Sequence, residues 1–150
     1  MKSHSDSIAR KLGEFAALCR RLGTPATVQR RAVLQAVLEH DDHPTADQVY
    51  EAARHRVPGI SRTTVYRALD ALVAMGLVRC LHHSGPAARF DGRTHRHHHL
   101  ICRHCNLVID LENPRLDRVR VADIDSGEFE IEDFSVHLTG ICPACRKART

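Results

Sequence analysis

Two pairs of cysteines are the strongest chemical signal in this sequence. Cys102 and Cys105 form the first pair and Cys142 and Cys145 the second, each with two residues between its cysteines. Four thiolates suit one tetrahedral zinc ion, and this spacing lets both sulfurs of a turn face the same ion. Because 36 residues separate the pairs, the ion would join distant parts of one domain. The pattern predicts a structural zinc site; two disulfides are the alternative, which would suit a secreted protein.

Histidines gather just before the first cysteine pair. Seven of the twelve lie between positions 82 and 104, and three are consecutive, His97, His98 and His99. Side chains two residues apart share one face of a strand, so His97 and His99 can bind one ion, with Asp110 on the neighbouring expected strand. This composition indicates metal binding. A tag remnant or solvated loop is the alternative, which the internal position disfavours.

Length and composition predict a globular protein. The 150 residues, 43% of them apolar, are enough to bury a core in one domain or in two small ones. The first residues lack the apolar run of a signal peptide, and no stretch is long enough to span a membrane. We therefore expect a cytoplasmic protein with no membrane partner, in which Cys19 and Cys80 are reduced core residues.

Charge is divided unevenly along the chain. Residues 1–90 hold 13 Lys and Arg against 8 Asp and Glu, whereas residues 91–150 hold 9 against 10. The basic half is the half expected to contact a polyanion.

The basic half begins with two predicted helices. Apolar residues recur at helical spacing from Ile8 to Leu22, before Gly23, with Arg10, Lys11, Arg20 and Arg21 on the outer face. A second helix follows a Thr27 cap. The inward positions expected for the two helices are Ile8, Leu12, Phe15, Cys19 and Leu22, then Val28, Ala32, Ala36 and Val37.

Two more helices and a hairpin complete this half. Thr45 with Gln48 fits a capping box for a third helix, and Ser61 caps a fourth. Strands at 77–81 and 87–91 follow, joined by a turn at Ser84-Gly85-Pro86. Short helices followed by a hairpin predict a winged helix-turn-helix domain over residues 1–90.

The fourth helix has the features of a DNA-reading helix. Its inward stripe fixes its angle, and its outward face can form hydrogen bonds in the major groove. A solvated amphipathic helix with ordinary surface charge is the alternative. The residues expected to contact DNA are Arg62, Thr63, Tyr66 and Arg67.

The second half predicts a small α+β domain after a hinge at 91–96. A strand leads into Cys102, and a second strand covers 107–111. A helix is expected from Asn113 to about Asp123. The last strand is expected over 129–138, with a bulge where its alternation slips at Glu132 and Asp133. The whole chain is thus predicted to be α+β.

Three motifs together resemble the ferric uptake regulator (Fur) family. They are Ser61-Arg-Thr-Thr-Val-Tyr-Arg-Ala-Leu69, His43-Pro-Thr-Ala-Asp47 before it, and His97-His-His-Leu-Ile-Cys102-x-x-Cys105 after it. The resemblance runs from about Thr27 to Cys145. It implies a homodimer in which residues 97–150 form the metal-binding dimerisation domain, and a repressor that binds an inverted-repeat operator in double-stranded DNA when metal is bound.

The resemblance also implies a regulatory metal site. Its ligands fall on His43, Asp91, His97, His99 and Asp110. Nitrogen and oxygen donors suit Fe²⁺ or Mn²⁺, with Zn²⁺ as a possible substitute. An ion bound by all five would join the two domains and fix the angle between reading helices.

Two carboxylates bear on the branch of the family. Zinc regulators commonly have cysteine at the position of Asp91, and iron regulators glutamate at that of Asp110, where the peroxide-sensing (PerR) branch has aspartate. The resemblance therefore favours a peroxide sensor, in which Fe²⁺ and hydrogen peroxide oxidise His43 and His97 and the repressor releases DNA. An iron-responsive uptake regulator is the alternative, and a zinc-responsive one is less favoured.

Two other possibilities have weaker support. Some family members have a further metal site. Here Arg96 stands at its first ligand position, His98 and Asp117 at the next two, and Asp133 or Phe134 near the last, so we expect no ordered third site. Histidines and carboxylates around a metal could activate water in a hydrolase. No nucleophile motif or phosphate-binding loop accompanies them in the sequence, so we expect a DNA-binding regulator and no enzyme.

Overall fold

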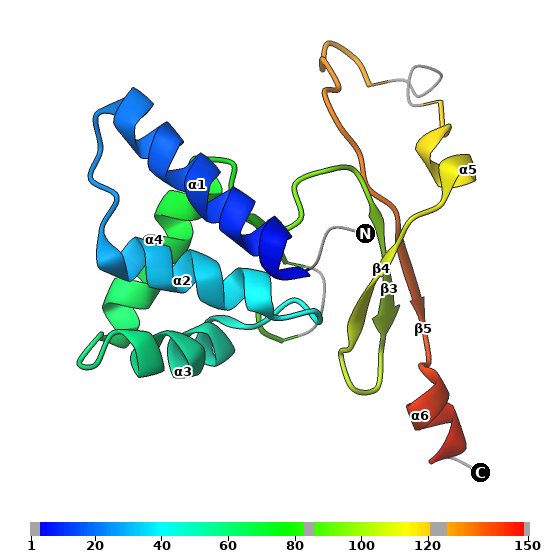
Figure 1. Cartoon of the computed structure of the whole chain (residues 1–150). Coiled ribbons are helices and arrows are strands. Elements are labelled where there is room, and N and C mark those ends of the chain that lie inside the picture. Colours follow the sequence, from blue (N-terminus) through cyan, green and yellow to red (C-terminus); the bar gives the residue numbers. More distant parts are fainter. Residues whose placement is uncertain (1–3, 83–85, 121–125, 149–150) are drawn as a thin grey trace. The chain divides into compact units, whose positions relative to one another are not determined.

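The computed structural model describes residues 4–82, 86–120 and 126–148. The chain divides into an N-terminal unit, residues 1–94, and a C-terminal unit, residues 95–150. Within the described ranges, the first unit has four helices and a hairpin, and the second a three-stranded sheet with two short helices (Figure 1). This confirms the α+β class. None of the helices in those ranges has the length and apolar character needed to cross a membrane.

The helices of the N-terminal unit begin where their caps predict. The oxygens of Thr27, Thr45 and Ser61 each accept the backbone N–H three residues on, at 3.2, 3.3 and 3.0 Å. At Thr45 the capping box is complete, because the Gln48 side chain accepts the Thr45 N–H at 2.8 Å. The four helices are α1 (His4–Leu22), α2 (Val28–Glu39), α3 (Ala46–Arg56) and α4 (Arg62–Ala74).

The core of this unit follows the predicted stripes except at two helix ends. Leu22, the last residue of α1, is 57% exposed, and Val28, the first residue of α2, is 68% exposed. Both predictions of an inward position are wrong, because a terminal residue can project beyond the neighbouring helices although it continues the periodicity. The largest fully buried side chains of this unit are Phe15, Val33, Leu34, Val37, Val49, Val65, Leu69, Leu72 and Val78.

The hairpin pairs β1 (Arg79–Leu81) with β2 (Arg89–Asp91) in antiparallel register. Cys80 lies opposite Phe90. Both strands are shorter than predicted, and the predicted turn at 84–86 lies largely outside the described residues.

The sheet of the C-terminal unit has the order β4-β3-β5. Its strands are β3 (His98–Cys102), β4 (Val108–Leu111) and β5 (His137–Gly140), and its helices are α5 (Pro114–Asp117) and α6 (Pro143–Lys147). Strand β3 is antiparallel to β4 and parallel to β5. Sequence patterns predicted β3 and β4 closely.

Strand β5 starts later than the predicted strand over 129–138. The backbone of Val136 forms an irregular junction, since its carbonyl accepts the His99 N–H at 3.0 Å while its own N–H donates to His98 Nδ1 at 3.1 Å. Regular pairing therefore begins at His137, and residues 126–136 are not in a strand. The bulge predicted at Glu132 and Asp133 is also wrong, because these residues are not part of a strand.

The helical predictions in this unit also need correction. Helix α5 ends at Asp117, short of the predicted end near Asp123, and residues 121–125 lie outside the described ranges. Helix α6 was not predicted. It begins at Pro143, since proline is favourable as the first residue of a helix. The preceding residue, Cys142, caps the helix, and its sulfur accepts the Cys145 N–H.

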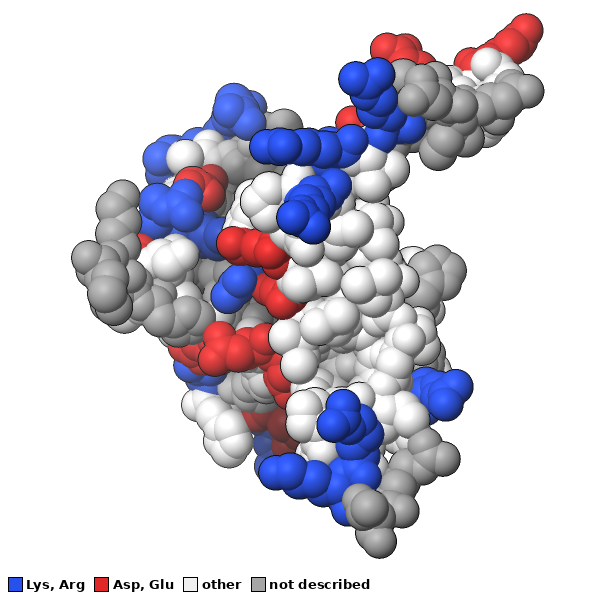
Figure 2. Space-filling view, turned by 90° about the vertical axis from the view of Figure 1, so that its right-hand side faces the viewer, with Lys and Arg blue, Asp and Glu red and all other residues white. Residues whose placement is uncertain are grey.

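The register of the sheet gives its two faces different chemistry. One row across the strands consists of Asp110, His99 and His137, because His99 pairs with both of the others. The next row, on the opposite face, consists of Leu100, Ile109 and Leu138, which are 39%, 45% and 44% exposed. Figure 2 shows a broad uncharged surface on this unit, with Lys and Arg at its margins.

Candidate metal centres and nucleic-acid interface

The four cysteines of the two pairs come together in the C-terminal unit. Cys102 ends β3, Cys105 lies in the turn after it, and Cys142 and Cys145 cap and enter α6. One ligand atom from each lies within 4.8 Å of all the others, and the sulfurs of Cys105 and Cys142 are 3.8 Å apart. None of the four is in a disulfide. This geometry fits the predicted structural zinc ion and not the disulfide alternative.

The turn after β3 is closed by backbone hydrogen bonds. The Asn106 N–H donates to the Cys102 carbonyl at 2.9 Å, and the Cys102 N–H donates to the Leu107 carbonyl at 2.9 Å. Asn106 has φ 58°, a left-handed conformation that asparagine tolerates better than most residues. The backbone thus folds so that the two sulfurs of the turn face the same point.

Hydrogen bonds divide the four thiols into unequal acids. The Cys142 N–H donates to the Cys102 sulfur at 3.3 Å, and this bond, with weaker support from Cys105 and His104, lowers the pKa of Cys102 from 9.0 to about 6. Interactions with the sulfurs of Cys142, Cys105 and Cys102 raise the pKa of Cys145 to about 12. At neutral pH the Cys102 side chain is mostly deprotonated, whereas that of Cys145 is protonated and must lose its proton when a metal binds.

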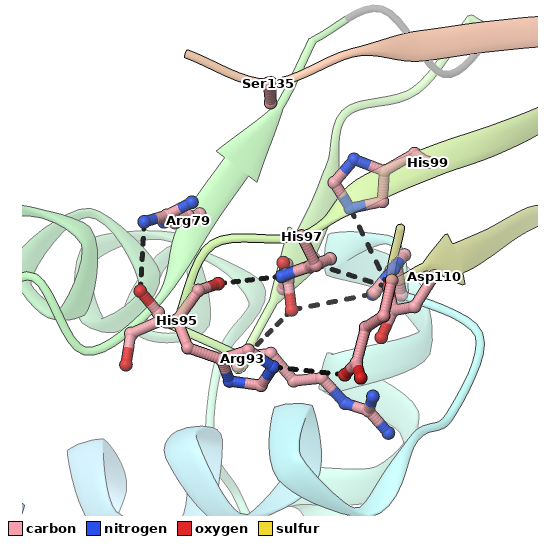
Figure 3. Close-up of polar contacts among 12 residues, drawn as sticks. Arg79, Arg93, His95, His97, His99, Asp110 and Ser135 are labelled. Carbon is pink, nitrogen blue, oxygen red and sulfur yellow. Dashed lines mark hydrogen bonds and ion pairs between the residues drawn. The ribbon is translucent and has the colours of Figure 1, made fainter. Parts of the chain in front are cut away.

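The C-terminal unit brings together three of the five predicted regulatory ligands. His97 Nε2 and His99 Nε2 lie 3.4 and 3.8 Å from Asp110 Oδ1, and the two histidine rings are 4.7 Å apart. Figure 3 shows both histidines beside Asp110. The His97 Nδ1 lies 2.9 Å from the His95 carbonyl. Because a carbonyl only accepts, Nδ1 carries the proton and Nε2 is the ligand atom.

The N-terminal unit brings together the other two predicted ligands. His43 Nδ1 lies 3.8 Å from Asp91 Oδ1, and both side chains are buried. Strand β2 arranges this pair, because Asp91 ends the strand while Arg89, two residues before, donates to the His43 carbonyl at 2.9 Å. His43 has φ 53°, in the left-handed region that residues other than glycine seldom adopt. The hydrogen bond from Arg89 to the His43 carbonyl helps to hold this conformation.

Asp91 has two neighbours that sequence patterns did not reveal. The Arg93 N–H donates to Asp91 Oδ1 at 2.7 Å, and the Lys11 ammonium donates to the Gly92 carbonyl. Burial lowers the pKa of Lys11, and the Asp91 carboxylate acts in the opposite direction. Lys11 is therefore not on the outer face of its helix as predicted. Only the fold shows this, since Lys11 and Asp91 are far apart in sequence.

The residues at the positions of the third metal site contact one another. Arg96 donates to Asp133 Oδ1 from Nε at 3.0 Å and lies over the Phe134 ring at 4.8 Å. His98 Nδ1 accepts the Val136 N–H, so Nε2 carries the proton that faces Asp117 at 3.2 Å. A guanidinium thus lies where a metal ligand would be needed.

The predicted DNA-contacting residues are all exposed on α4. Thr63 and Arg67 are exposed, and Tyr66 is 50% exposed. Arg62 forms an ion pair with Asp47 and lies 4.4 Å over the Tyr50 ring of α3. Arg62 is thereby held at the N-terminal end of the helix, where reading helices contact base edges.

Comparisons with known proteins identify the family of this chain. The sequence profile of the Ferric uptake regulator family (FUR) matches residues 21–139. The chain belongs to the ferric uptake regulator family. The peroxide-responsive repressor PerR of Staphylococcus epidermidis is 32% identical to this Fur-family chain over 147 residues, which are 98% of each protein.

Two solved structures show the same fold as this Fur-family chain. The Helicobacter pylori ferric uptake regulator Fur, which has three functional metal-binding sites, aligns with a TM-score of 0.77 at 18% identity and covers 93% of each chain. A zinc uptake regulator complexed with zinc and DNA aligns with a TM-score of 0.66 at 23% identity, covering 95% of this chain and 97% of its own.

Proposed function

We propose that this protein is a metal-dependent transcriptional repressor that responds to peroxide. Family membership and the PerR relatives support this function. The observation that carries it is the convergence of two ligand groups. His97, His99 and Asp110 converge in the C-terminal unit, and His43 and Asp91 converge in the N-terminal unit.

One ion bound by both groups would link the two units. The C-terminal group offers two imidazole nitrogens and a carboxylate, and the N-terminal group one of each, which suits Fe²⁺ or Mn²⁺ and tolerates Zn²⁺. The energy of binding would favour the arrangement of units in which all five ligands reach the ion. Release of the ion would remove that constraint on the reading helix.

Peroxide sensing is supported by the PerR relatives and by residue 110, which is aspartate and not the glutamate common in iron regulators. When bound, Fe²⁺ would supply the one-electron chemistry that converts hydrogen peroxide into an oxidant. The chain's part is to present His43 and His97 beside the ion, so that oxygen adds to an imidazole. An oxidised ring binds metal poorly, and the repressor would then release DNA.

The proposed assembly is a homodimer formed through the face of the sheet that carries Leu100, Ile109 and Leu138. These three side chains are partly exposed in one row, on the face opposite His99. An uncharged face of this kind is typical of interfaces between subunits. A two-fold dimer in the cytoplasm would present two reading helices to an inverted-repeat operator in double-stranded DNA.

The second metal of the proposal is zinc at the four cysteines, which differs in kind from the regulatory metal. Thiolates select zinc over Fe²⁺ and Mn²⁺, so each metal has its own ligand set. Zinc there would stabilise the C-terminal unit and take no part in sensing.

The test is DNA binding by the zinc-loaded protein to an inverted-repeat duplex, measured by fluorescence anisotropy with and without Mn²⁺. We expect Mn²⁺ to tighten binding about 100-fold, near the upper range of allosteric coupling. His97→Ala should abolish the response to Mn²⁺, and His104→Ala, an exposed histidine outside both groups, should keep it. Binding that is tight without Mn²⁺ and unchanged by His97→Ala would contradict the function.

A further inference from the structure

The row Asp110–His99–His137 contains one histidine that has no part in the five-ligand set. His137 is the first residue of β5 and pairs with His99 across the parallel ladder. The two rings are 5.2 Å apart at 86°. In Figure 3 the His99 ring lies between Asp110 and Ser135, the residue two positions before His137.

The two ring spacings on either side of His99 match those of imidazoles that share an ion. Two imidazoles bound at about 2.1 Å have ring centres on the order of 5 Å apart. The distance from His97 to His99 is 4.7 Å, and that from His99 to His137 is 5.2 Å. His137 is thus as close to His99 as a co-ligand needs to be.

A neighbouring hydroxyl holds the His137 ring. Ser135 Oγ lies 3.2 Å from His137 Nε2. Metal-binding histidines commonly have their second nitrogen fixed by a hydrogen bond of this type. The His137 ring therefore has both a potential co-ligand, His99, and an orienting hydroxyl, that of Ser135, within reach.

We propose that His137 is a further ligand of the regulatory metal, so that the C-terminal unit binds the ion by itself through His97, His99, Asp110 and His137. This inference rests on the proposed function of the same site. Three imidazoles and one carboxylate form a complete four-coordinate set for a divalent transition metal. The ion would then load onto the C-terminal unit first, and His43 and Asp91 would join or replace ligands afterwards.

The test uses the full-length, zinc-loaded protein with Co²⁺ as the probe, because Co²⁺ reports its ligand set in its visible spectrum. Affinity is measured by competition with a chelator. The His43→Ala/Asp91→Ala variant should still bind one Co²⁺ per chain. Adding His137→Ala to that variant should weaken binding at least tenfold and shift the spectrum.

Two controls make the result specific. His95→Ala removes another imidazole, 5.5 Å from the His97 ring but exposed and outside the row, and it should change neither affinity nor spectrum. His137→Gln keeps a polar side chain of similar size; if His137→Ala loses the cooperative thermal transition, His137→Gln replaces it and should show the same loss of Co²⁺.

The outcomes separate this inference from the proposed function. If His137→Ala and His137→Gln leave Co²⁺ affinity and spectrum unchanged while His97→Ala abolishes binding, His137 is not a ligand and the five-ligand site stands. If His97→Ala also has no effect, the regulatory site itself is wrong, and the inference falls with it.

Discussion

The two candidate metal centres differ in where the chain places their ligands. All four cysteines lie in the C-terminal unit, within 4.8 Å of one another. The five proposed regulatory ligands are divided, with His43 and Asp91 in the N-terminal unit and His97, His99 and Asp110 in the C-terminal unit. A centre contained in one unit stabilises that unit, whereas a divided set makes metal binding depend on how the units are arranged. The first design suits structure and the second suits regulation.

The largest expected effect comes from breaking the contained centre. Cys142→Ser removes one thiolate, so zinc is lost, while the serine hydroxyl can still cap α6. Structural zinc contributes about 10 kcal/mol or more to folding in small domains. We expect the C-terminal unit to lose its cooperative thermal transition and the protein to run as a monomer in size-exclusion chromatography.

Cys80→Ser is the matched control for this change, since Cys80 lies in the hairpin outside the cluster. That variant should keep its zinc content and its dimer. A stable dimer of the Cys142→Ser variant without zinc would show that the contained centre is not needed for folding.

Breaking either half of the divided set should give a different result. Asp91→Ala and Asp110→Ala each remove one carboxylate from a different unit, so each should weaken Mn²⁺-dependent DNA binding about 100-fold. Zinc content and thermal stability should stay close to those of the parent protein. If only Asp110→Ala affected DNA binding, the N-terminal unit would take no part in metal sensing.

The pH dependence of zinc binding should further distinguish the contained centre. Cys145, with its pKa raised to about 12, is protonated at neutral pH and must release that proton to bind zinc. Zinc affinity should therefore rise about tenfold per pH unit for each proton released. Below about pH 6, where Cys102 also becomes protonated, the dependence should steepen. Chelator competition between pH 5 and 8 measures this, and a flat profile would contradict the thiol assignment.

A smaller effect is expected from the reading helix. Arg62→Ala removes an exposed guanidinium that Asp47 and Tyr50 hold in place. We expect about tenfold weaker binding to the operator, with unchanged Mn²⁺ affinity. Arg54→Ala, an exposed arginine paired with Glu51 on α3, is the control. Equal loss of DNA and Mn²⁺ binding in Arg62→Ala would mean that the reading helix was assigned wrongly.

Sequence patterns predicted the features that local chemistry determines. Thr27, Thr45 and Ser61 cap their helices because a side-chain oxygen satisfies a nearby backbone N–H, an interaction that a few residues specify. The CxxC spacing likewise specifies how the sulfurs of a turn can meet. These features can be predicted without knowing how the rest of the chain folds.

The features that patterns missed depend on distant segments. His137 lies beside His99 only because β5 pairs with β3 in parallel register, 38 positions away. The proximity of Lys11 to the hinge depends on a contact with Gly92. The strand predicted over 129–138 failed because Val136 bonds to the His98 side chain, which alternation cannot reveal.

The most direct test of the central claim is the intact mass of the anaerobically Fe²⁺-loaded protein before and after a brief peroxide pulse. Peptide mapping then locates any change at His43 and His97. The account predicts one added oxygen on either histidine, with loss of DNA binding. An unchanged mass, with DNA binding that still follows free iron, would contradict peroxide sensing and make the protein an iron-responsive regulator.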